Sequence, residues 1–542
     1  MHNLIEIPFK LSEEQSKPVL SNSKYIKILA GAGAGKTEVL IRRVIYLLIN
    51  KNIAPESIVA FTFTDKAANE MKSRIIRRIK EINPDYNVSN TGKMYIGTIH
   101  SFCFRLLQDH FGYGMYKIID QNQEMAYILQ NGYKFGIAKE EGTNYSDKCI
   151  NFQKTIDIFY NEELSRDNVN KLNPHFIKML DRYEESMDTD KIISFSRLIY
   201  LAVNKIMDNP EKISYIKYLL VDEYQDINKI QYDLIKLIGK NSGIFAVGDP
   251  RQSIYEWRGS NYKYFNDFNK YFSNTEEFTL NENRRSSKSI VDISNIIVKK
   301  FPVNHKYPDM VPVREKSGYA VETEYNDAND EAENIANIIN NEVKNNNKKY
   351  SDFAVLFRSV NTSGDFILNQ FKKMKIPYLV SGNSGLFKRG EVLALAQVFC
   401  WLAPDGFWYS NNKYIKGNDL ISTAIKNWED TVFKLNNNIK NKLCNIRSDI
   451  DNYKDYKELY QDILNAFCYL KLNQNNDLDN AVMANIGRFT KVLGDYEKSV
   501  RYRGTRNNIE KEMKNLCWFI NAYASHAHTM RQKMMISHKI MS

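Results

Sequence analysis

Residues 25–37 read Tyr-Ile-Lys-Ile-Leu-Ala-Gly-Ala-Gly-Ala-Gly-Lys-Thr, and this stretch decides the fold. An apolar run leads into a turn of small residues, and apolar positions from Val39 to Leu48 then recur at helical spacing. A strand, a small-residue turn and a helix in succession cradle phosphate, because backbone N–H groups and the helix N-terminus point at the anion. The predicted nucleotide cradle is Ala30, Gly31, Ala32, Gly33, Ala34, Gly35, Lys36 and Thr37.

Two residues of this cradle have specific predicted roles. Lys36 reaches the β- and γ-phosphates of a nucleotide, and Thr37 holds Mg²⁺. The strict motif has glycine where Ala30 stands, and an ordinary glycine-rich turn is the alternative interpretation.

A second apolar run, Tyr218–Val221, ends in the acidic pair Asp222 and Glu223. We predict that Asp222 is the second protein partner of Mg²⁺ and that Glu223 orients or deprotonates the attacking water. Such a carboxylate separates hydrolases from simple nucleotide binders. An acidic turn at the end of a strand, without chemistry, is the alternative.

The amino-acid composition limits the classes of protein to which the chain can belong. The chain has 542 residues, and 75 Lys and Arg against 64 Asp and Glu leave a formal charge of +11, which favours a polyanionic partner only modestly. Six cysteines show no C-x-x-C pair, which disfavours a zinc or iron–sulfur site. No stretch approaches the roughly 18 apolar residues of a membrane span, so we expect a soluble, cytoplasmic protein.

The fold class expected from this pattern is α/β, because apolar runs alternate with helical segments up to Leu280. The runs typical of buried strands are Tyr25–Ala30, Ile58–Phe63, Met94–Thr98, Tyr218–Val221 and Ile244–Val247. A second set of predicted strands is Tyr319–Tyr325, Phe353–Arg358 and Pro377–Ser381, and from Glu391 onward the pattern is helical. We expect a first motor domain over 1–110 and 191–283, a helical insertion over 111–190, part of a second domain over 284–400, and a helical region over 401–542.

Two blocks carry a specific resemblance: 222–226 (Asp-Glu-Tyr-Gln-Asp) and 247–259 (Val-Gly-Asp-Pro-Arg-Gln-Ser-Ile-Tyr-Glu-Trp-Arg-Gly). With Gln15, the phosphate cradle, 61–68 and 97–102, they form an ordered set that resembles the UvrD/Rep/PcrA family of superfamily 1 DNA helicases. The resemblance implies two RecA-like P-loop NTPase domains with helical insertions, ATP and Mg²⁺ as cofactors, and movement along single-stranded DNA, 3′ to 5′.

The same resemblance assigns further nucleotide contacts. Gln15 is similar to the glutamine that reads adenine, with a surface residue after the capping Ser12 as the alternative. Gln252 is similar to the γ-phosphate sensor, and Arg285 to an arginine that neutralises charge in the transition state. Arg284 stands where the family usually has a tyrosine under the base, and a guanidinium plane can stack there too.

Single strands are held by aromatic platforms combined with positive charge. Phe63, Tyr255 and Trp257 are the predicted platforms, with a place in the core as the alternative for each. His100 and Arg258 are candidate polar contacts in the same groove, with a packing or capping role as the alternative. Arg358 is expected to meet DNA phosphate, or else to form a surface ion pair. Residues Ser194–Arg197 stand where the family usually has an acidic run. The sequence offers no functional explanation for this difference from the family.

The last two motor blocks of the family are not recognisable before Ser542. The expectation is therefore a C-terminally truncated chain with an incomplete second motor domain, or one completed by a protein partner. Three functions remain open. They are an ATP-dependent DNA helicase or translocase, a nucleotide-gated DNA-binding subunit that hydrolyses little ATP alone, and a small-molecule kinase, which leaves the acidic pair and Trp257 unexplained.

Overall fold

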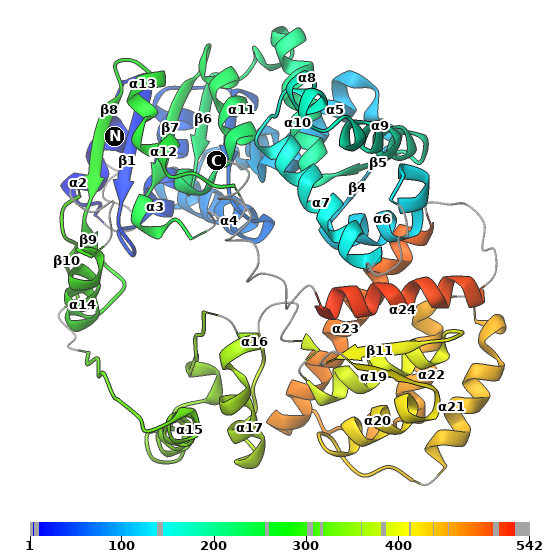
Figure 1. Ribbon diagram of the computed structural model, residues 1–542. Coiled ribbons are helices and arrows are strands. Elements are labelled where there is room, and N and C mark those ends of the chain that lie inside the picture. The colour runs from blue at the N-terminus through cyan, green and yellow to red at the C-terminus, as the bar shows by residue number, and fades with distance from the viewer. Residues whose placement is uncertain are drawn as a thin grey trace. The chain divides into compact units, whose positions relative to one another are not determined.

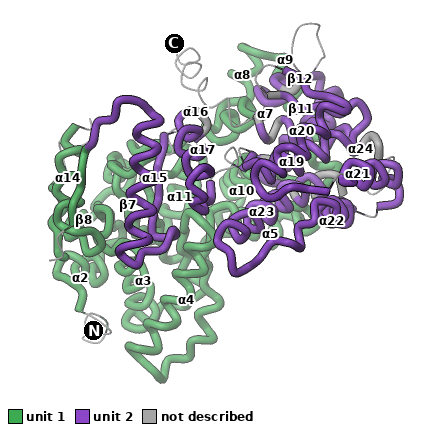
Figure 2. The backbone as a smooth tube through the Cα atoms, turned by 90° about the horizontal axis from the view of Figure 1, so that it is seen from below, with its two compact units in different colours: residues 1–118, 154–322 green, residues 119–153, 323–542 purple. Residues whose placement is uncertain are grey.

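The chain forms two compact units, one of residues 1–118 and 154–322 and the other of residues 119–153 and 323–542 (Figure 2). The computed structural model describes residues 4, 10–137, 145–254, 259–300, 307–314, 318–358, 360–380, 386–387, 389–410, 413–436, 438–453, 455–501 and 509–525. Among these residues, no helix combines the length and the apolar character needed to cross a bilayer.

A six-stranded parallel sheet organises the first unit, with the strand order β3-β2-β6-β7-β1-β8 (Figure 1). The register pairs Leu29 with Gly248 and Phe61 with Val221 and Gly97, so the carboxyl ends of the strands meet at one edge. The strands are β1 (Tyr25–Ala30), β2 (Ile58–Phe61), β3 (Tyr95–Gly97), β6 (Tyr218–Val221), β7 (Gly243–Gly248) and β8 (Glu276–Leu280).

Helices cover both faces of this sheet. Ile26 and Ile28 pack with α3 (Lys36–Ile45) and α4 (Asp65–Ile82), whereas Leu29 packs in a second cluster on the opposite face. Because both faces are buried, β2, β6 and β7 are continuously apolar rather than alternating, whereas the edge strand β8 exposes Glu276 and Glu277. The second cluster is built by α5 (Ile99–Phe111), α10 (Phe195–Asp208) and α11 (Lys229–Gly239).

The rest of the first unit frames this core. Its remaining elements are α2 (Glu13–Leu20), the end of α7 (Tyr145–Asn161), α8 (Arg166–Leu172), α9 (Pro174–Thr189), α12 (Lys263–Asn266), α13 (Phe268–Tyr271), α14 (Lys288–Val298), the strand pair β4 (Lys117–Ile119) and β5 (Ile192–Ser194), and the pair β9 (Glu282–Asn283) and β10 (Val311–Pro312).

The second unit is mostly helical and is built around α19 (Gly390–Leu402), which is buried along its whole length. A helix that is apolar all round belongs in a core. Its other elements are α6 (Gln121–Phe135), α15 (Ala328–Asn345), α16 (Val360–Ser363), α17 (Asp365–Lys373), β11 (Phe407–Ser410), β12 (Lys413–Lys416), α20 (Gly417–Glu429), α21 (Ile439–Ser448), α22 (Tyr456–Ala466), α23 (Asp477–Arg501) and α24 (Ile509–Ser525).

The predicted strands of the first domain are confirmed with shifts of at most two residues, whereas the edge strand β8 and the short strands β5 and β9 were missed. The second set is wrong, because segments 319–325 and 353–358 and the described part of 377–381 hold no strand. Phe353, Val355 and Phe357 pack against the α15 and α17 cluster, while Leu356 is 90% exposed. An extended segment lying on helices alternates in burial as a strand does, without ladder hydrogen bonds.

Two further outcomes concern the helical regions. The region after Glu391, predicted without strands, contains the antiparallel hairpin of β11 and β12. The predicted insertion over 111–190 is divided between the units, since α6 packs against α23 and α24 in the second unit.

A buried charge cluster joins α3 to α4. Arg42 Nε and Arg74 Nη2 each lie 2.8 Å from a carboxylate oxygen of Glu38, and Arg78 Nε lies 3.2 Å away. Burial alone would raise the pKa of Glu38, but hydrogen bonds from Arg42 and Arg74 outweigh it and hold the pKa below its ordinary value. The negative charge of Glu38 therefore balances the positive charges of the neighbouring arginine side chains.

We expect Glu38→Gln to weaken the attachment of α3 to α4 by about 3 kcal/mol, because it leaves buried arginines without their counter-charge. Hydrogen–deuterium exchange of the α3 and α4 peptides would measure this loss, with second-unit peptides as an internal reference. A folded-state pKa that is lowered contributes stability above the unfolded value of about 4.5, and that stability is lost as pH falls through the lowered pKa. Glu70→Gln, at the exposed end of Arg74, is the matched control and should change little.

Candidate nucleotide and DNA site

The phosphate loop between β1 and α3 requires glycine at two positions. Gly33 and Gly35 have φ angles of +73° and +87°, in the left-handed region that favours glycine. A Cβ atom at Gly33 would lie 2.8 Å from the Cβ of Arg285, and one at Gly35 would lie 2.6 Å from Gln15 Nε2. The loop is therefore held closely between the residues predicted to contact the base and the γ-phosphate.

Five side chains from three strand ends form a closed ring of hydrogen bonds beside this loop. Lys36 Nζ donates to Glu223 Oε2 at 2.7 Å and to Gln252 Oε1 at 3.3 Å. Gln225 Nε2 donates to the same Glu223 oxygen at 2.9 Å, and Gln225 Oε1 accepts from Asp249 N at 3.0 Å. Gln252 Nε2 donates to Asp249 Oδ2 at 2.9 Å, which closes the ring. The structure thus brings Lys36, Glu223 and Gln252 together as predicted.

Gln225 and Asp249 are functional candidates that sequence reasoning quoted but gave no role. Gln225 is 1% exposed and Asp249 2% exposed. Outside the ring, Gln225 Nε2 also donates to Asp226 Oδ2, and Asp249 Oδ1 accepts from Arg251 N. Both residues are polar and lie within motif blocks directly after buried strands, and this position was the sequence signal that could have identified them.

Burial and neighbouring negative charge disfavour the ionised form of the carboxyl groups after β6. Burial, together with the charge of Glu223, raises the pKa of Asp222 to about 6, and the same causes act on Asp226. Lys36 lowers both. Glu223 itself has a left-handed backbone, with a φ of +49°. Two adjacent carboxylates at one strand end favour an added cation, so the donor set of Asp222 with the Thr37 hydroxyl suits Mg²⁺, which prefers oxygen ligands completed by phosphate and water. In the described part of the chain, no cluster of three His, Cys, Asp or Glu side chains forms a metal cage.

Gln15 lies on α2 and contacts the loop directly. Its Nε2 donates to the Ala34 carbonyl at 3.0 Å, and its Oε1 accepts from Ser12 N in a capping box. The side chain is 5% exposed, so the alternative of a surface residue is wrong. In this structure the amide supports the loop.

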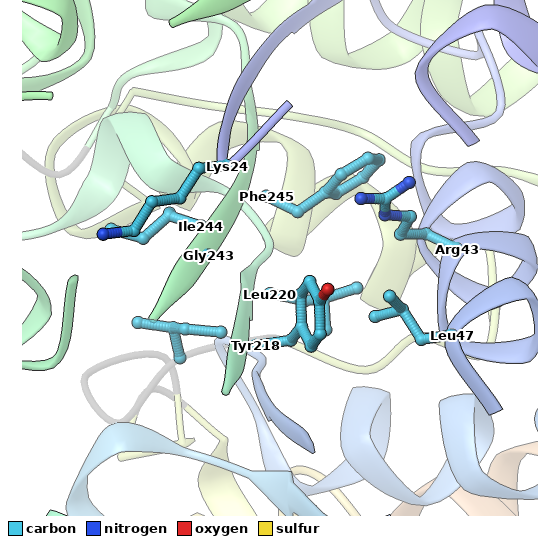
Figure 3. Close-up of a pocket in the computed structure, with 9 residues that line it drawn as sticks. Lys24, Arg43, Leu47, Tyr218, Leu220, Gly243, Ile244 and Phe245 are labelled. Carbon is cyan, nitrogen blue, oxygen red and sulfur yellow. The ribbon is translucent and has the colours of Figure 1, made fainter. Parts of the chain in front are cut away.

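Arg43 fixes the other end of α2. Its Nη1 donates to the carbonyls of Val19 and Ser21, and burial lowers its pKa to about 10, so it stays charged at neutral pH. Figure 3 shows Arg43 beside Tyr218 and Phe245 around a cavity of about 10 Å³. That space admits at most one water, so it is a packing detail and not a ligand site.

The block after β8 packs onto the phosphate loop. Asn283 Nδ2 donates to the Ala32 carbonyl at 2.8 Å, and its Oδ1 accepts from the backbone N–H groups of Arg285 and Ser286. Arg284 N donates to the Gly33 carbonyl at 3.0 Å, and the Arg284 guanidinium pairs with Glu282. Asn283, which sequence reasoning missed, therefore places Arg284 and Arg285 at the loop.

Aromatic side chains lie at the carboxyl ends of β2 and β3. Phe63 is 45% exposed, and His100 at the start of α5 lies with its ring 4.9 Å from that of Phe195, which is 41% exposed. Burial lowers the pKa of His100 to about 4, so the imidazole is neutral at pH 7. Phe195 was missed by sequence reasoning. Its exposure, unusual for a large aromatic ring, is visible only in the fold.

Of the four remaining predicted DNA contacts, the structure describes one. Tyr255, Trp257 and Arg258 lie outside the described residues. Arg358 is exposed in the second unit. The unexplained Arg197 forms a bidentate pair with Asp188, at 2.8 Å for each hydrogen bond, and so has a structural role.

The parallel sheet, its phosphate loop and the acidic pair bound to Lys36 define a P-loop nucleotide-binding protein. The chain matches the UvrD/REP helicase N-terminal domain over residues 11–273 and the UvrD-like helicase C-terminal domain over residues 278–538. It belongs to the UvrD/Rep family of helicases.

Individual relatives agree with this assignment. The chain is 32% identical to the ATP-dependent DNA helicase Rep of Buchnera aphidicola over 70% of its length and 56% of the relative's. It is 30% identical to the ATP-dependent DNA helicase PcrA of Staphylococcus epidermidis, over 70% of this chain and 52% of the relative. A probable DNA helicase II homolog of Mycoplasma capricolum is 28% identical over 94% of this chain and 70% of its own length.

The chain thus spans about half the length of the first two relatives. The match to the C-terminal domain runs to residue 538, and it does not support the expectation of a truncated chain with an incomplete second domain.

We expect Asn283→Ala to weaken binding of Mg·ATP roughly tenfold, because a buried amide that makes three hydrogen bonds to the loop and its neighbour is lost. Titration with a fluorescent ATP analogue measures the affinity. Asn281→Ala is the control, since Asn281 engages its neighbours through its main chain. Equal affinities for the two variants would contradict a supporting role for Asn283.

Proposed function

We propose that this protein is an ATP-dependent DNA helicase or translocase that couples ATP hydrolysis to movement along single-stranded DNA and to unwinding. The observation that carries the proposal is the hydrogen-bond ring, which joins the predicted lysine and glutamate of the ATP site to Gln252. Gln252 lies three residues before the predicted DNA platform Tyr255. The 3′ to 5′ polarity is proposed from the family resemblance.

In the proposed mechanism, nucleotide binding opens the ring. Lys36 exchanges Glu223 for the β- and γ-phosphates, and Glu223 is released to orient the attacking water. Gln252 loses the same lysine contact and turns to the γ-phosphate, so Asp249 and Gln225 respond to nucleotide state. Mg²⁺, held by Thr37 and Asp222, would neutralise phosphate charge.

The remaining nucleotide contacts follow from the packing around the loop. Arg285, placed by Asn283, would stabilise charge in the transition state, which contributes on the order of 10³-fold or more. Gln15 would exchange its Ala34 contact for the adenine edge, and Arg284 would stack on the base.

For DNA, we propose that bases stack on Phe63, Phe195, Tyr255 and Trp257. Because its pKa is low, His100 is neutral at pH 7. A neutral imidazole has one donor and one acceptor nitrogen, so it is suited to hydrogen bonding with a base or sugar rather than to pairing with phosphate. Arg258 and Arg358 would supply the positive charge for the backbone.

A nucleotide-gated DNA-binding subunit with little ATPase of its own is the second candidate. It is motivated by the family's distal arginine block, which is not recognisable in the sequence. The two candidates differ in turnover by the chain alone.

We expect ATP hydrolysis by the purified chain to rise at least tenfold with single-stranded DNA, and Lys36→Ala and Glu223→Gln to abolish it. Lys36→Ala removes the phosphate contact, whereas Glu223→Gln should still bind ATP, because it loses only the carboxylate that activates water. A phosphate-release assay beside ATP binding measures both. Lys80→Ala, an exposed lysine on α4, is the control. Tight ATP and DNA binding without turnover would favour the second candidate.

We expect Phe195→Ala to weaken binding of a short oligo-dT about tenfold, because one base loses its stacking platform, and to raise the DNA concentration for half-maximal ATPase accordingly. Fluorescence anisotropy measures the affinity. Phe366→Ala, which removes a phenylalanine of similar exposure from α17, is the matched control. An unchanged affinity in Phe195→Ala would remove Phe195 from the DNA surface.

A further inference from the structure

The hairpin of β11 and β12 and helix α24 enclose a cavity of about 310 Å³ in the second unit. Figure 1 labels β11 and α24, and Figure 2 labels β11 and β12. Phe407, Tyr414 and Trp518 line the cavity with Lys416 and Lys514, and we name it the aromatic pocket. Its volume lies in the range of small-ligand sites.

The aromatic rings of the pocket are arranged at steep angles to one another. The rings of Phe407 and Trp518 are 4.7 Å apart at 73°, and those of Phe407 and Tyr414 are 5.3 Å apart at 69°. Phe407 is buried, whereas Tyr414 is 57% exposed and Tyr409, 4.8 Å from it, is 40% exposed. The pocket therefore combines a buried aromatic floor with an exposed aromatic wall.

The floor is held in place by a buried amide. Asn521 Nδ2 donates to the Phe407 carbonyl and Asn521 Oδ1 accepts from Tyr409 N, each at 2.9 Å. These bonds fasten β11 to α24 as a neighbouring strand would. A ligand would meet a preformed site, and little ordering would oppose binding.

The charged groups that line the pocket are mainly positive. Lys416 Nζ lies 5.7 Å from the centre of the Tyr414 ring, and Lys514 is half-exposed, with its Nζ 4.0 Å from the Asp405 carboxylate. Two lysines oppose this single carboxylate, which is itself 89% exposed. Flat apolar faces beside exposed ammonium groups match a ligand that is flat and aromatic at one end and anionic at the other.

We propose that the aromatic pocket is an accessory site for single-stranded DNA, separate from the phosphate-loop site, in which one base stacks against Tyr414 and Trp518. The adjoining phosphates pair with Lys416 and Lys514. The choice of DNA as the ligand rests on the proposed function. The pocket itself uses no residue of the nucleotide site.

The test is photocrosslinking of the full chain to oligo-dT that carries 5-bromodeoxyuridine, followed by mass spectrometry of the linked peptides. We expect links to peptides containing Tyr414 or Trp518, in addition to links in the first unit. Tyr414→Ala combined with Lys416→Ala should remove the pocket links and weaken binding of a long oligo-dT about tenfold, with ATP binding unchanged. Tyr319→Ala with Lys442→Ala, at exposed positions that do not line the pocket, is the matched control.

Each other outcome has a distinct meaning. Links confined to the first unit, or equal affinity in the pocket and control variants, overturn the accessory site and leave the proposed motor function standing. Links to the pocket alone support the site and count against the predicted DNA groove. No links at all overturn both. Links that form only with a bromouridine RNA oligomer overturn DNA as the ligand.

Discussion

The ammonium group of Lys36 is the point on which the nucleotide site depends. It donates hydrogen bonds to Glu223 and Gln252. Its positive charge also acts on the buried carboxyl group of Asp222, whose pKa it lowers. A partly buried ammonium needs such compensation, and the carboxyl edge of a parallel sheet supplies it, because strands distant in sequence end at the same edge. The phosphate loop, the acidic pair and Gln252 therefore form one hydrogen-bonded unit.

Buried polar contacts hold this unit from several sides. Asn283 binds the loop carbonyl of Ala32, Gln15 binds that of Ala34, and Arg43 fastens the helix that carries Gln15. Glu38, two residues after Lys36, ties the loop helix to α4, which begins directly after the aromatic end of β2. In each case a buried charged or amide side chain makes hydrogen bonds that specify its position, although Arg43 Nε has no hydrogen-bond partner in the described part of the chain. The loop is thus connected to α2, which carries Gln15, and through α4 to the end of β2, next to the exposed ring of Phe63.

The two units use aromatic residues in different ways. In the first unit, exposed rings stand at the ends of sheet strands, where the sheet fixes their spacing. In the second, they gather on a hairpin fastened to α24 by Asn521. Sequence reasoning found no strand in that region, since a four-residue strand rich in aromatic residues looks the same as a helix segment at this length. The predicted strand at 353–358 failed for the opposite reason, because burial alternates there without a pairing partner. Residues 319–324 are exposed throughout and hold no strand.

The sequence alone predicts the parallel sheet of the first unit, the phosphate loop, and the roles proposed for Lys36, Asp222 and Glu223. These features are local: a buried strand, a small-residue turn and a helix start are contiguous, and their order is readable without knowing their neighbours. Tertiary structure alone decided that Gln225, Asp249 and Asn283 complete the site, that Phe195 stands beside His100, and that Arg197 pairs with Asp188. Each of these roles depends on groups far apart in the chain, or on exposure, and no periodicity in the sequence records which distant groups will meet.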